Sequence, residues 1–535
     1  MEVDCIHYKD TGYFSPIVLD YLKESDKLKP FYSHSPALSS FGRIIEQKKF
    51  DQEKREVLVN ALKAQYQRAK INLAVDQKTI KNIELLADEN TFTVTTGHQL
   101  NLFTGPLYFI YKIVSAINLA KQLKKEYPAN HFVPVYWMAT EDHDFEEISF
   151  FRFQGKKLKW DTKQEGAVGR MNPQELSELF ADFSKLLLPY TSHGNQLKKW
   201  FEEAYLKRDT LADAMRYLVH ELFSEYGLVI VDGDEASLKA QMHSYFEEEL
   251  LHEVSSQKVD HQSKELAKNY KVQANPRAIN LFYLRENSRN RIEYLSERFY
   301  IVDSELSFSK EEMLDELNNH PERFSPNVLL RPLYQEVILP NLAYIGGGGE
   351  LAYWFQLKST FEHFKVPFPM LLLRNSVLWM DEKQSKYACE LGISNEELFQ
   401  AEGVLLKNWV KKNSKLDLEL KQELADFEKL YKDLKQKSKI IDESLAPHVG
   451  ALAEKQKQSI QQLSEKLIRA ERKKNDSAAV RIQTLKEELF PNASLQERTN
   501  NFSEFYLAYG NQFIVSLLEN LQLPTNQFSV IKNRT

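Results

Sequence analysis

The stretch TFTVTTGHQLNLFTGPLYFIYKIVSAINLAKQLKKEYPANHFVPVYWMATEDHDFEE, residues 91–147, has the pattern of a βαβ unit. Residues 91–99 and 131–140 are runs of β-branched and apolar side chains, and residues 107–127 between them have the length and spacing of a helix. Strands without polar alternation are typical of a parallel sheet that helices cover on both faces. The connection between two such strands is expected to be right-handed.

The same order of strand, loop and helix recurs later in the chain. It appears in GLVIVDGDEASLKAQM (residues 227–242) and in LAYIGGGGELAYWFQLKSTFEHF (residues 342–364), and the apolar run VPFPMLLLR (residues 366–374) follows. We therefore predict an α/β protein whose doubly wound parallel sheet is assembled from separate segments. The predicted core comprises residues 1–150, which begin with a helical lead-in, and residues 226–244 and 326–398, with insertions at residues 151–225 and 245–325.

Residues 399–490 have a different composition, rich in Lys, Glu, Gln and Leu. Apolar residues such as Leu420, Leu424 and Phe427 recur at spacings of three or four, as in amphipathic helices. Pro447 and Gly450 interrupt this pattern and predict a kink or hairpin turn there. We expect an antiparallel coiled-coil arm whose apolar stripes pair two subunits into a homodimer, and a segment at residues 491–535 that returns to the core.

Composition excludes several classes of protein. The 535 residues include 70 Lys and Arg against 76 Asp and Glu, so the formal charge of −6 disfavours binding to nucleic acid. No run of about 18 apolar residues and no secretory leader is evident, which predicts a cytoplasmic protein without a membrane anchor. Cys5 and Cys389 are isolated, so neither a disulfide framework nor a thiolate zinc site is expected.

Three loops are expected at the carboxyl ends of the strands, where ligands bind in open α/β sheets. In the first loop, Gly97 and Gly105 allow close backbone approach, and Thr104 to Pro106 precede a helix whose free N–H groups favour an anion such as phosphate. The spacing matches neither common nucleotide-binding glycine motif, so a tight βα turn is the alternative.

The second loop places Glu141, Asp142, His143 and Asp144 directly after an apolar strand. Such a cluster can coordinate Mg²⁺, receive an ammonium group or deprotonate an amine. The structural alternative is a solvated loop that caps a helix.

The third loop contains Gly346 to Gly349 followed by Glu350, and a run of glycines favours close approach of main-chain N–H groups to a substrate. Trp354 and Gln356 follow within two helical turns and could face the same pocket. Arg331 and Arg374 can supply fixed cations for a carboxylate or phosphate. No motif singles out a serine or cysteine nucleophile.

Five segments together resemble the BshC family of cysteine-adding enzymes in bacillithiol biosynthesis. They are TGHQLNLFTGPLYFIYK (residues 96–112), FVPVYWMATEDHDFEEI (132–148), NPRAINLFYL (275–284), GGGGELAYWFQLK (346–358) and LFPNASLQER (489–498). The resemblance implies a Rossmann-like core with two connective insertions and a coiled-coil arm that pairs two subunits. It also implies a ligase that joins L-cysteine to the amino group of glucosaminyl-malate to give bacillithiol. Because amide formation from a carboxylate is uphill in water, ATP is expected, through either a cysteinyl adenylate or an acyl phosphate.

The resemblance also suggests roles for the residues in the three loops. ATP would lie against Gly97, His98, Gln99, Thr104, Gly105 and Pro106, with Lys112 as a further phosphate ligand. Mg²⁺ would lie at Glu141, Asp142 and Asp144, and the general base would be His143 or Asp144. The substrate would contact residues from all three regions: Glu141, Asp142, Gly346, Gly347, Gly348, Gly349, Glu350, Trp354, Gln356, Arg331 and Arg374. A nucleotide-dependent transferase or hydrolase on the same core and a non-catalytic coiled-coil scaffold are the alternatives.

Overall fold

A five-stranded parallel sheet forms the centre of the molecule. The computed structural model describes residues 2–72, 77–189 and 191–533. The strand order is β13–β12–β2–β3–β6, and all four neighbouring pairs are parallel. The strands are β2 (Thr91–His98), β3 (His131–Met138), β6 (Val229–Asp232), β12 (Asn341–Gly346) and β13 (Met370–Leu373). This confirms the predicted doubly wound sheet, and its direction of winding reverses between β2 and β12.

The strands of this sheet are buried along almost their whole length because helices pack against it. Helix α6 (Tyr108–Glu126) connects β2 to β3 and contacts both strands. Helices α4 (Gln52–Arg68) and α5 (Gln77–Leu85) belong to the predicted helical lead-in and pack against β6.

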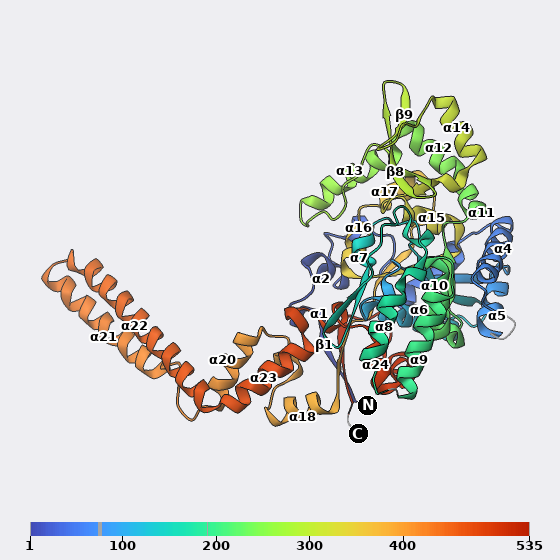
Figure 1. Cartoon of the computed structure of the whole chain (residues 1–535). Helices are drawn as coiled ribbons and strands as arrows, with labels where there is room; N and C mark the ends of the chain where they lie inside the picture. Colours follow the sequence, from blue (N-terminus) through green and yellow to red (C-terminus); the bar gives the residue numbers. More distant parts are fainter. Residues whose placement is uncertain (1, 73–76, 190, 534–535) are drawn as a thin grey trace.

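Two groups of elements separate the core strands in the sequence (Figure 1). Between β3 and β6 lie the hairpin β4 (Phe150–Phe153) and β5 (Lys156–Lys159) and helices α8 (Ser177–Leu186), α9 (Ser192–Phe201) and α10 (Leu211–Phe223). Between β6 and β12 lie helices α12 (His243–His252), α13 (Val254–Ala267), α14 (Lys310–Asn319) and α15 (Arg331–Ile338), and an antiparallel sheet of β7 (Leu281–Arg285), β8 (Ser288–Leu295), β9 (Arg298–Ile301), β10 (Ser307–Phe308) and β11 (Phe324–Pro326).

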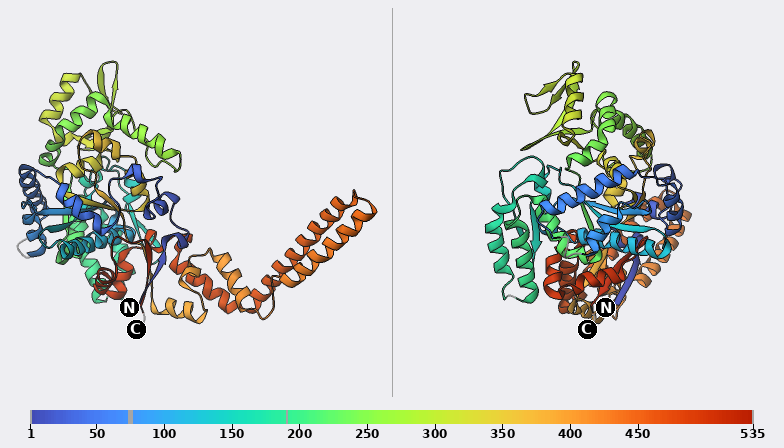
Figure 2. Two further views of the ribbon diagram at one scale, coloured as in Figure 1. Left: turned by 180° about the vertical axis from the view of Figure 1, so that it is seen from behind. Right: turned by 90° about the vertical axis from the view of Figure 1, so that its right-hand side faces the viewer.

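A long helical hairpin projects from the body of the molecule, as two opposite views show (Figures 1 and 2). It consists of α21 (Lys421–Ile441) and α22 (Leu445–Lys474), which α20 (Glu402–Asn413) and α23 (Asp476–Leu489) join to the body. The hairpin turn lies at residues 442–444, not at Pro447 and Gly450 as predicted. Both of these residues lie in α22, because proline is tolerated in the first turn of a helix, where its missing N–H has no intrahelical partner.

A second sheet brings the two ends of the described chain together. Strand β15 (Gln527–Lys532) pairs with β1 (Glu2–His7) in antiparallel orientation and with β14 (Val377–Met380) in parallel. The helices before β15, α24 (Phe502–Tyr509) and α25 (Gln512–Asn520), contact α9 and α6 respectively. No helix in the described ranges is both long and apolar enough to span a membrane.

Candidate active site

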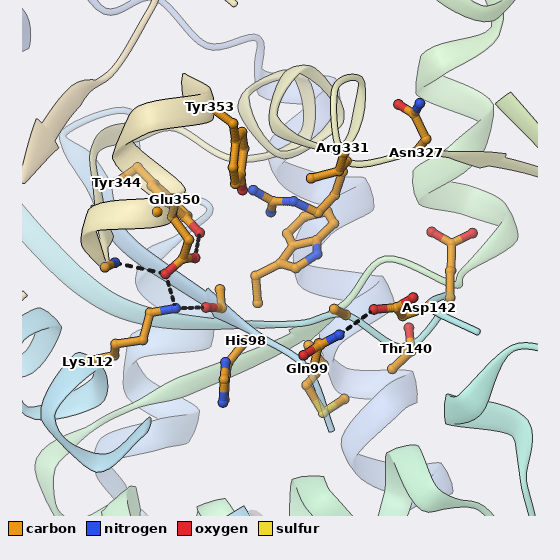
Figure 3. Close-up of a pocket in the computed structure, with 18 of the residues that line it drawn as sticks. His98, Gln99, Lys112, Thr140, Asp142, Asn327, Arg331, Tyr344, Glu350 and Tyr353 are labelled. Atoms are coloured by element: carbon orange, nitrogen blue, oxygen red, sulfur yellow. Dashed lines mark hydrogen bonds and ion pairs between the residues drawn. The ribbon is translucent and has the colours of Figure 1, made fainter. Parts of the chain in front are cut away.

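A cavity of about 420 Å³ lies at the carboxyl ends of four strands of the parallel sheet (Figure 3). Residues 97–99 line it at the end of β2, residues 139–142 after β3, residues 347–350 after β12, and Arg374 after β13. The loops after β2 and β12 flank the point where the winding of the sheet reverses, which is where open α/β sheets bind their ligands. All three loops singled out in the sequence therefore contribute residues to one cavity.

Lys112, which is buried, and Glu350, which is half-buried, form an ion pair in one wall of this cavity. The ammonium group of Lys112 lies 2.6 Å from Glu350 Oε2 and also donates a hydrogen bond to the carbonyl oxygen of Gly97. Glu350 accepts further hydrogen bonds from the Tyr344 hydroxyl (2.6 Å) and the Gly347 N–H (2.8 Å). Burial opposes ionisation of Glu350, but Lys112 outweighs it and holds the pKa of this carboxyl below its usual value. Lys112 therefore joins the first loop to the third, and its charge is already balanced.

His98, the last residue of β2, and Gln99, which follows it, line the cavity. The His98 ring packs against Tyr108 and Phe109, and burial, with the nearby charges of Lys112 and Arg374, holds its pKa well below the usual value. His98 is therefore neutral at pH 7. The Gln99 amide is fixed by hydrogen bonds from Nε2 to Asp142 Oδ2 and Glu147 Oε2, both 2.8 Å long.

The turn at Thr104 to Pro106 does not fit the predicted phosphate site. The Leu107 N–H, at the start of the following helix, donates to the carbonyl oxygen of Asn500 (2.9 Å). The Asn501 side chain donates to the carbonyl oxygens of Phe103 and Gly105. The segment before α24 thus binds backbone groups on both sides of this turn, and none of the residues Thr104 to Pro106 lines the cavity.

Within the acidic loop, only Glu141 and Asp142 line the cavity. Glu141 forms an ion pair with Lys239 (2.6 Å). Asp142 Oδ1 accepts the backbone N–H groups of His143 (2.8 Å) and Asp144 (3.3 Å), so the loop folds around this carboxylate.

His143 and Asp144 are exposed and lie outside the cavity lining, which does not fit the prediction that either is the base. His143 Nδ1 lies 2.9 Å from Nη1 of Arg289. Because a guanidinium can only donate, this nitrogen accepts and the proton of the neutral ring is on Nε2. Burial, followed by the charge of Arg289, lowers the pKa of His143. The lone pair of His143 Nδ1 is thus already used in the hydrogen bond from Arg289.

The described residues contain no group of three or more His, Cys, Asp or Glu side chains that could hold a metal ion. The predicted Mg²⁺ ligands Glu141, Asp142 and Asp144 therefore do not form a protein cage. Glu141 is paired with Lys239, and Asp144 does not line the cavity.

The glycine-rich loop contributes Gly347, Gly348 and Gly349 to the cavity, whereas Gly346 lies behind it. Trp354 and Gln356 were predicted to face the substrate, but neither lines the cavity. Trp354 is buried and stacks on Tyr344, with ring centroids 4.5 Å apart. The buried Gln356 side chain accepts the N–H groups of residues 273 and 274 and donates to Ser263, so it anchors a connecting segment.

Both arginines predicted from the sequence line the cavity, but their surroundings differ. Arg374 forms a bidentate ion pair with Glu497, with distances of 2.7 and 3.1 Å. Arg331 donates to the neutral Gln335 side chain (3.0 Å) and lies beside the rings of Tyr344 and Trp137. Sequence reasoning missed further lining residues, among them Arg289, Asn327, Tyr353 and Arg498. Of these, Arg498 lies within one of the five segments quoted above, whereas Arg289 lies on β8 in a stretch without a motif.

Comparison with known proteins assigns the family. Residues 1–375 match the family model described as "Bacillithiol biosynthesis BshC, N-terminal Rossmann-like domain", and residues 377–533 match "Bacillithiol biosynthesis BshC, C-terminal coiled-coil domain". The chain belongs to the BshC family. Within this BshC chain the boundary between the two matches follows β13 directly. Arg498 and the partner of Arg374, Glu497, therefore come from the C-terminal region and complete a cavity that the Rossmann-like region builds.

BshC relatives match over the whole length of the chain. Proteins named "Putative cysteine ligase BshC" include one from Flavobacterium johnsoniae, 48% identical over 99% of this chain and 100% of the relative. Another, from Flavobacterium psychrophilum, is 46% identical over 100% of both chains. A more distant one, from Bacillus cytotoxicus, is 28% identical over 93% of this chain and 94% of the relative.

Proposed function

We propose that this chain is a ligase that joins the carboxyl group of L-cysteine to the amino group of glucosaminyl-malate, with ATP as the source of free energy. The product is bacillithiol, and the new bond is an amide. The name of its BshC relatives supports a cysteine ligase. The observation that carries the proposal is the cavity at the switch point of the sheet, with its surplus of positive charge.

This surplus of charge fits ATP as well as a carboxylate substrate. The charges of Lys112, Glu141 and Arg374 are balanced by ion pairs with Glu350, Lys239 and Glu497, and Asp142 adds one further carboxylate to the lining, near Arg289. Arg289, Arg331 and Arg498 also line the cavity but form no ion pair with a described residue. Unpaired arginines suit phosphate and carboxylate ligands, both of which their planar fork can bind in bidentate fashion.

Gly97, His98, Gln99 and Arg498 would hold ATP at the carboxyl end of β2. The chemistry that ATP supplies when bound is activation of the cysteine carboxyl group for attack by an amine. A Cβ atom at Gly97 would lie 3.2 Å from the Tyr344 hydroxyl and 3.6 Å from Arg331 Nη1, so this position favours glycine. A Mg²⁺ ion that accompanies ATP would take most of its ligands from phosphate oxygens and water, as is common for this ion.

Asp142 is the residue that we assign to the amine of the acceptor. An amine attacks a carboxyl group only after its ammonium form has lost a proton, and a carboxylate can bind the ammonium group and accept that proton. Asp142 lines the cavity, and the Gln99 amide and two backbone N–H groups fix its orientation. It takes the role that the sequence suggested for His143 or Asp144.

The test is a reaction of the purified protein with L-cysteine, glucosaminyl-malate and ATP, followed by mass spectrometry. The expected result is bacillithiol in stoichiometric ratio to consumed ATP, with no ATP consumed when either cosubstrate is omitted. Recovery of AMP or of ADP would identify the bond of ATP that is cleaved. Consumption of ATP without the amino sugar would instead indicate a hydrolase.

The arm leads us to propose a homodimer as well. Leu430 and Leu434 on α21 are 56% and 40% exposed, and Leu463 on α22 is 49% exposed. The two helices of the hairpin leave these side chains uncovered, and a second copy of the arm would bury them.

A further inference from the structure

We infer that Arg331 and Arg289 form a subsite for the carboxylates of the malyl group and so select the acceptor, an inference that rests on the proposed function. The proposed reaction uses only the amino group of glucosaminyl-malate. Recognition of the remainder of this acceptor therefore requires groups that are not part of the reaction itself.

Arg331 is a fixed cation that lacks an anionic partner. It is the first residue of α15, and its Cζ atom lies 5.5 Å from the Tyr344 ring centroid and 5.8 Å from the Trp137 ring centroid. Nη1 donates to Gln335, whereas Nη2 is buried and has no hydrogen-bond partner among the described residues. A buried, unsatisfied donor of this kind is costly, and a bound carboxylate would satisfy it.

Arg289 is held beside the same cavity by neutral partners. Its Nε, Nη1 and Nη2 atoms donate to Ser325, His143 and the carbonyl oxygen of Pro326 at 2.9 to 3.0 Å, and its Cζ lies 4.0 Å from the Phe282 ring centroid. A guanidinium has five N–H donors, so two of them, one on each Nη atom, remain for a ligand. Ser325 and Pro326, which accept hydrogen bonds from Arg289, precede Arg331 by six and five residues, so one short segment holds both cations in the lining of the cavity.

The arrangement of the acceptor agrees with this placement. In a glucosaminyl compound the amino group and the glycosidic substituent are on adjacent ring carbons, so the groups that bind them must be neighbours. Asp142, which we assign to the amine, directly precedes His143, the hydrogen-bond partner of Arg289. A dicarboxylate on the neighbouring carbon would therefore face Arg289, and Arg331 lines the same cavity.

The test is titration calorimetry of glucosaminyl-malate and, separately, of ADP on the intact protein. We expect Arg331→Gln to weaken binding of glucosaminyl-malate by about 10- to 150-fold, the range for lost hydrogen bonds to a charged group, and Arg331→Lys by less because the charge remains. Binding of ADP should weaken by a clearly smaller factor, because Arg331 lies near Gly97, against which we place ATP. Arg291→Gln is the control for removal of an arginine charge, because Arg291 pairs with Glu293 away from the cavity lining.

A second acceptor separates this inference from the proposed function. Methyl glucosaminide has the amine without the carboxylates, and its binding should be equally weak in the wild type and in Arg331→Gln. Unchanged affinity of Arg331→Gln for glucosaminyl-malate, or a loss confined to ADP, would overturn the carboxylate subsite even if the ligase reaction is confirmed. If the variants bind as expected but no amide forms, the subsite stands and the ligase proposal fails. Arg331→Lys keeps the test open should Arg331→Gln fail to fold.

Discussion

Asp142 and Asp144 belong to the same loop but differ in what surrounds them. Asp142 lines the cavity, whereas Asp144 is exposed at the start of the short helix α7 (Phe145–Ile148). We predict that Asp142→Asn lowers turnover by about 10²- to 10⁴-fold, the usual contribution of a positioned acid or base. Asp144→Asn should change turnover by less than about twofold. Initial rates of amide formation, with melting temperatures as a check on folding, measure the difference.

The pair of variants is a matched control because each removes one negative charge from the same loop. Equal losses of activity would show that the charge of the loop matters and not the position of one carboxylate. A loss in Asp144→Asn alone would return the role of base to the residue indicated by the sequence.

His98 makes stability depend on pH. Burial and the charges of Lys112 and Arg374 keep its folded-state pKa well below the usual value. The unfolded chain therefore binds a proton where the folded chain does not, and stability contributed by His98 is lost as the pH falls below about 6.5. Between about pH 7.5 and about pH 5.5 the free energy of unfolding that is lost through His98 is at most about 1.4 kcal/mol. Urea unfolding at both pH values should show that the free energy of unfolding falls less in His98→Gln than in the wild type. Equal falls would contradict the lowered pKa of His98.

The sequence indicates which loops form the site but not which way each side chain points. The loops after β2, β3 and β12 were predictable. Each follows an apolar strand and contains glycine or acidic residues, and the carboxyl ends of parallel strands place such loops at one edge of the sheet. Lys112 and Trp354 lie on helices, where a rotation of about 100° per residue decides between cavity and core, and Gln356 lies in the turn after α16 (Gly348–Trp354). Their long-range partners settle that choice, as Glu350 does for Lys112. Arg289 reaches the cavity from another sheet, which no local pattern indicates.

At the scale of secondary-structure elements, the turn before α6 is structural. Gly105 has a φ of 64°, and a Cβ atom there would lie 2.5 Å from Cβ of Asn101. Gly105→Ala should therefore lower the free energy of unfolding by roughly 1–3 kcal/mol, through backbone strain and this contact. The folded variant should keep its affinity for ADP, because the turn does not line the cavity.

Gly403→Ala provides the control for this substitution. Gly403 lies in α20, and a Cβ atom there would meet no other atom within 4 Å. Its replacement should leave stability unchanged or raise it by less than about 1 kcal/mol. Loss of ADP binding in folded Gly105→Ala would restore the predicted phosphate site at this turn.

Elements of the central sheet were predictable for a reason that does not apply to the terminal sheet. The core strands are buried on both faces, so nearly every residue in them is apolar or β-branched. Strand β1 is mostly half-buried or exposed, and its partner β15 lies near the other end of the chain. Neither periodicity nor neighbouring turns indicate such a pairing. The arm was predictable as helices, but its turn was misplaced because proline interrupts a pattern without always ending a helix.

At the scale of the whole molecule, we predict a dimer through the arm. Light scattering at micromolar concentration should give twice the chain mass of 62.5 kDa. Leu430→Glu combined with Leu434→Glu should reduce the mass to that of one chain, because charges would replace the exposed apolar contact. Gln436→Glu introduces a single negative charge two residues beyond Leu434, on a different face of the helix, and should leave the dimer intact. A wild-type protein of one chain mass, unaffected by any of these changes, would contradict the proposal.

The central claim, that this chain adds cysteine to glucosaminyl-malate in the cavity of the Rossmann-like domain, is tested most directly in cells. The measurement is mass spectrometry of low-molecular-weight thiols and their precursors in a strain that lacks this protein. The account predicts loss of bacillithiol with accumulation of glucosaminyl-malate, restored by the wild-type chain and by Asp144→Asn but not by Asp142→Asn at equal protein level. Normal bacillithiol in the deletion strain, or full restoration by Asp142→Asn, would contradict it.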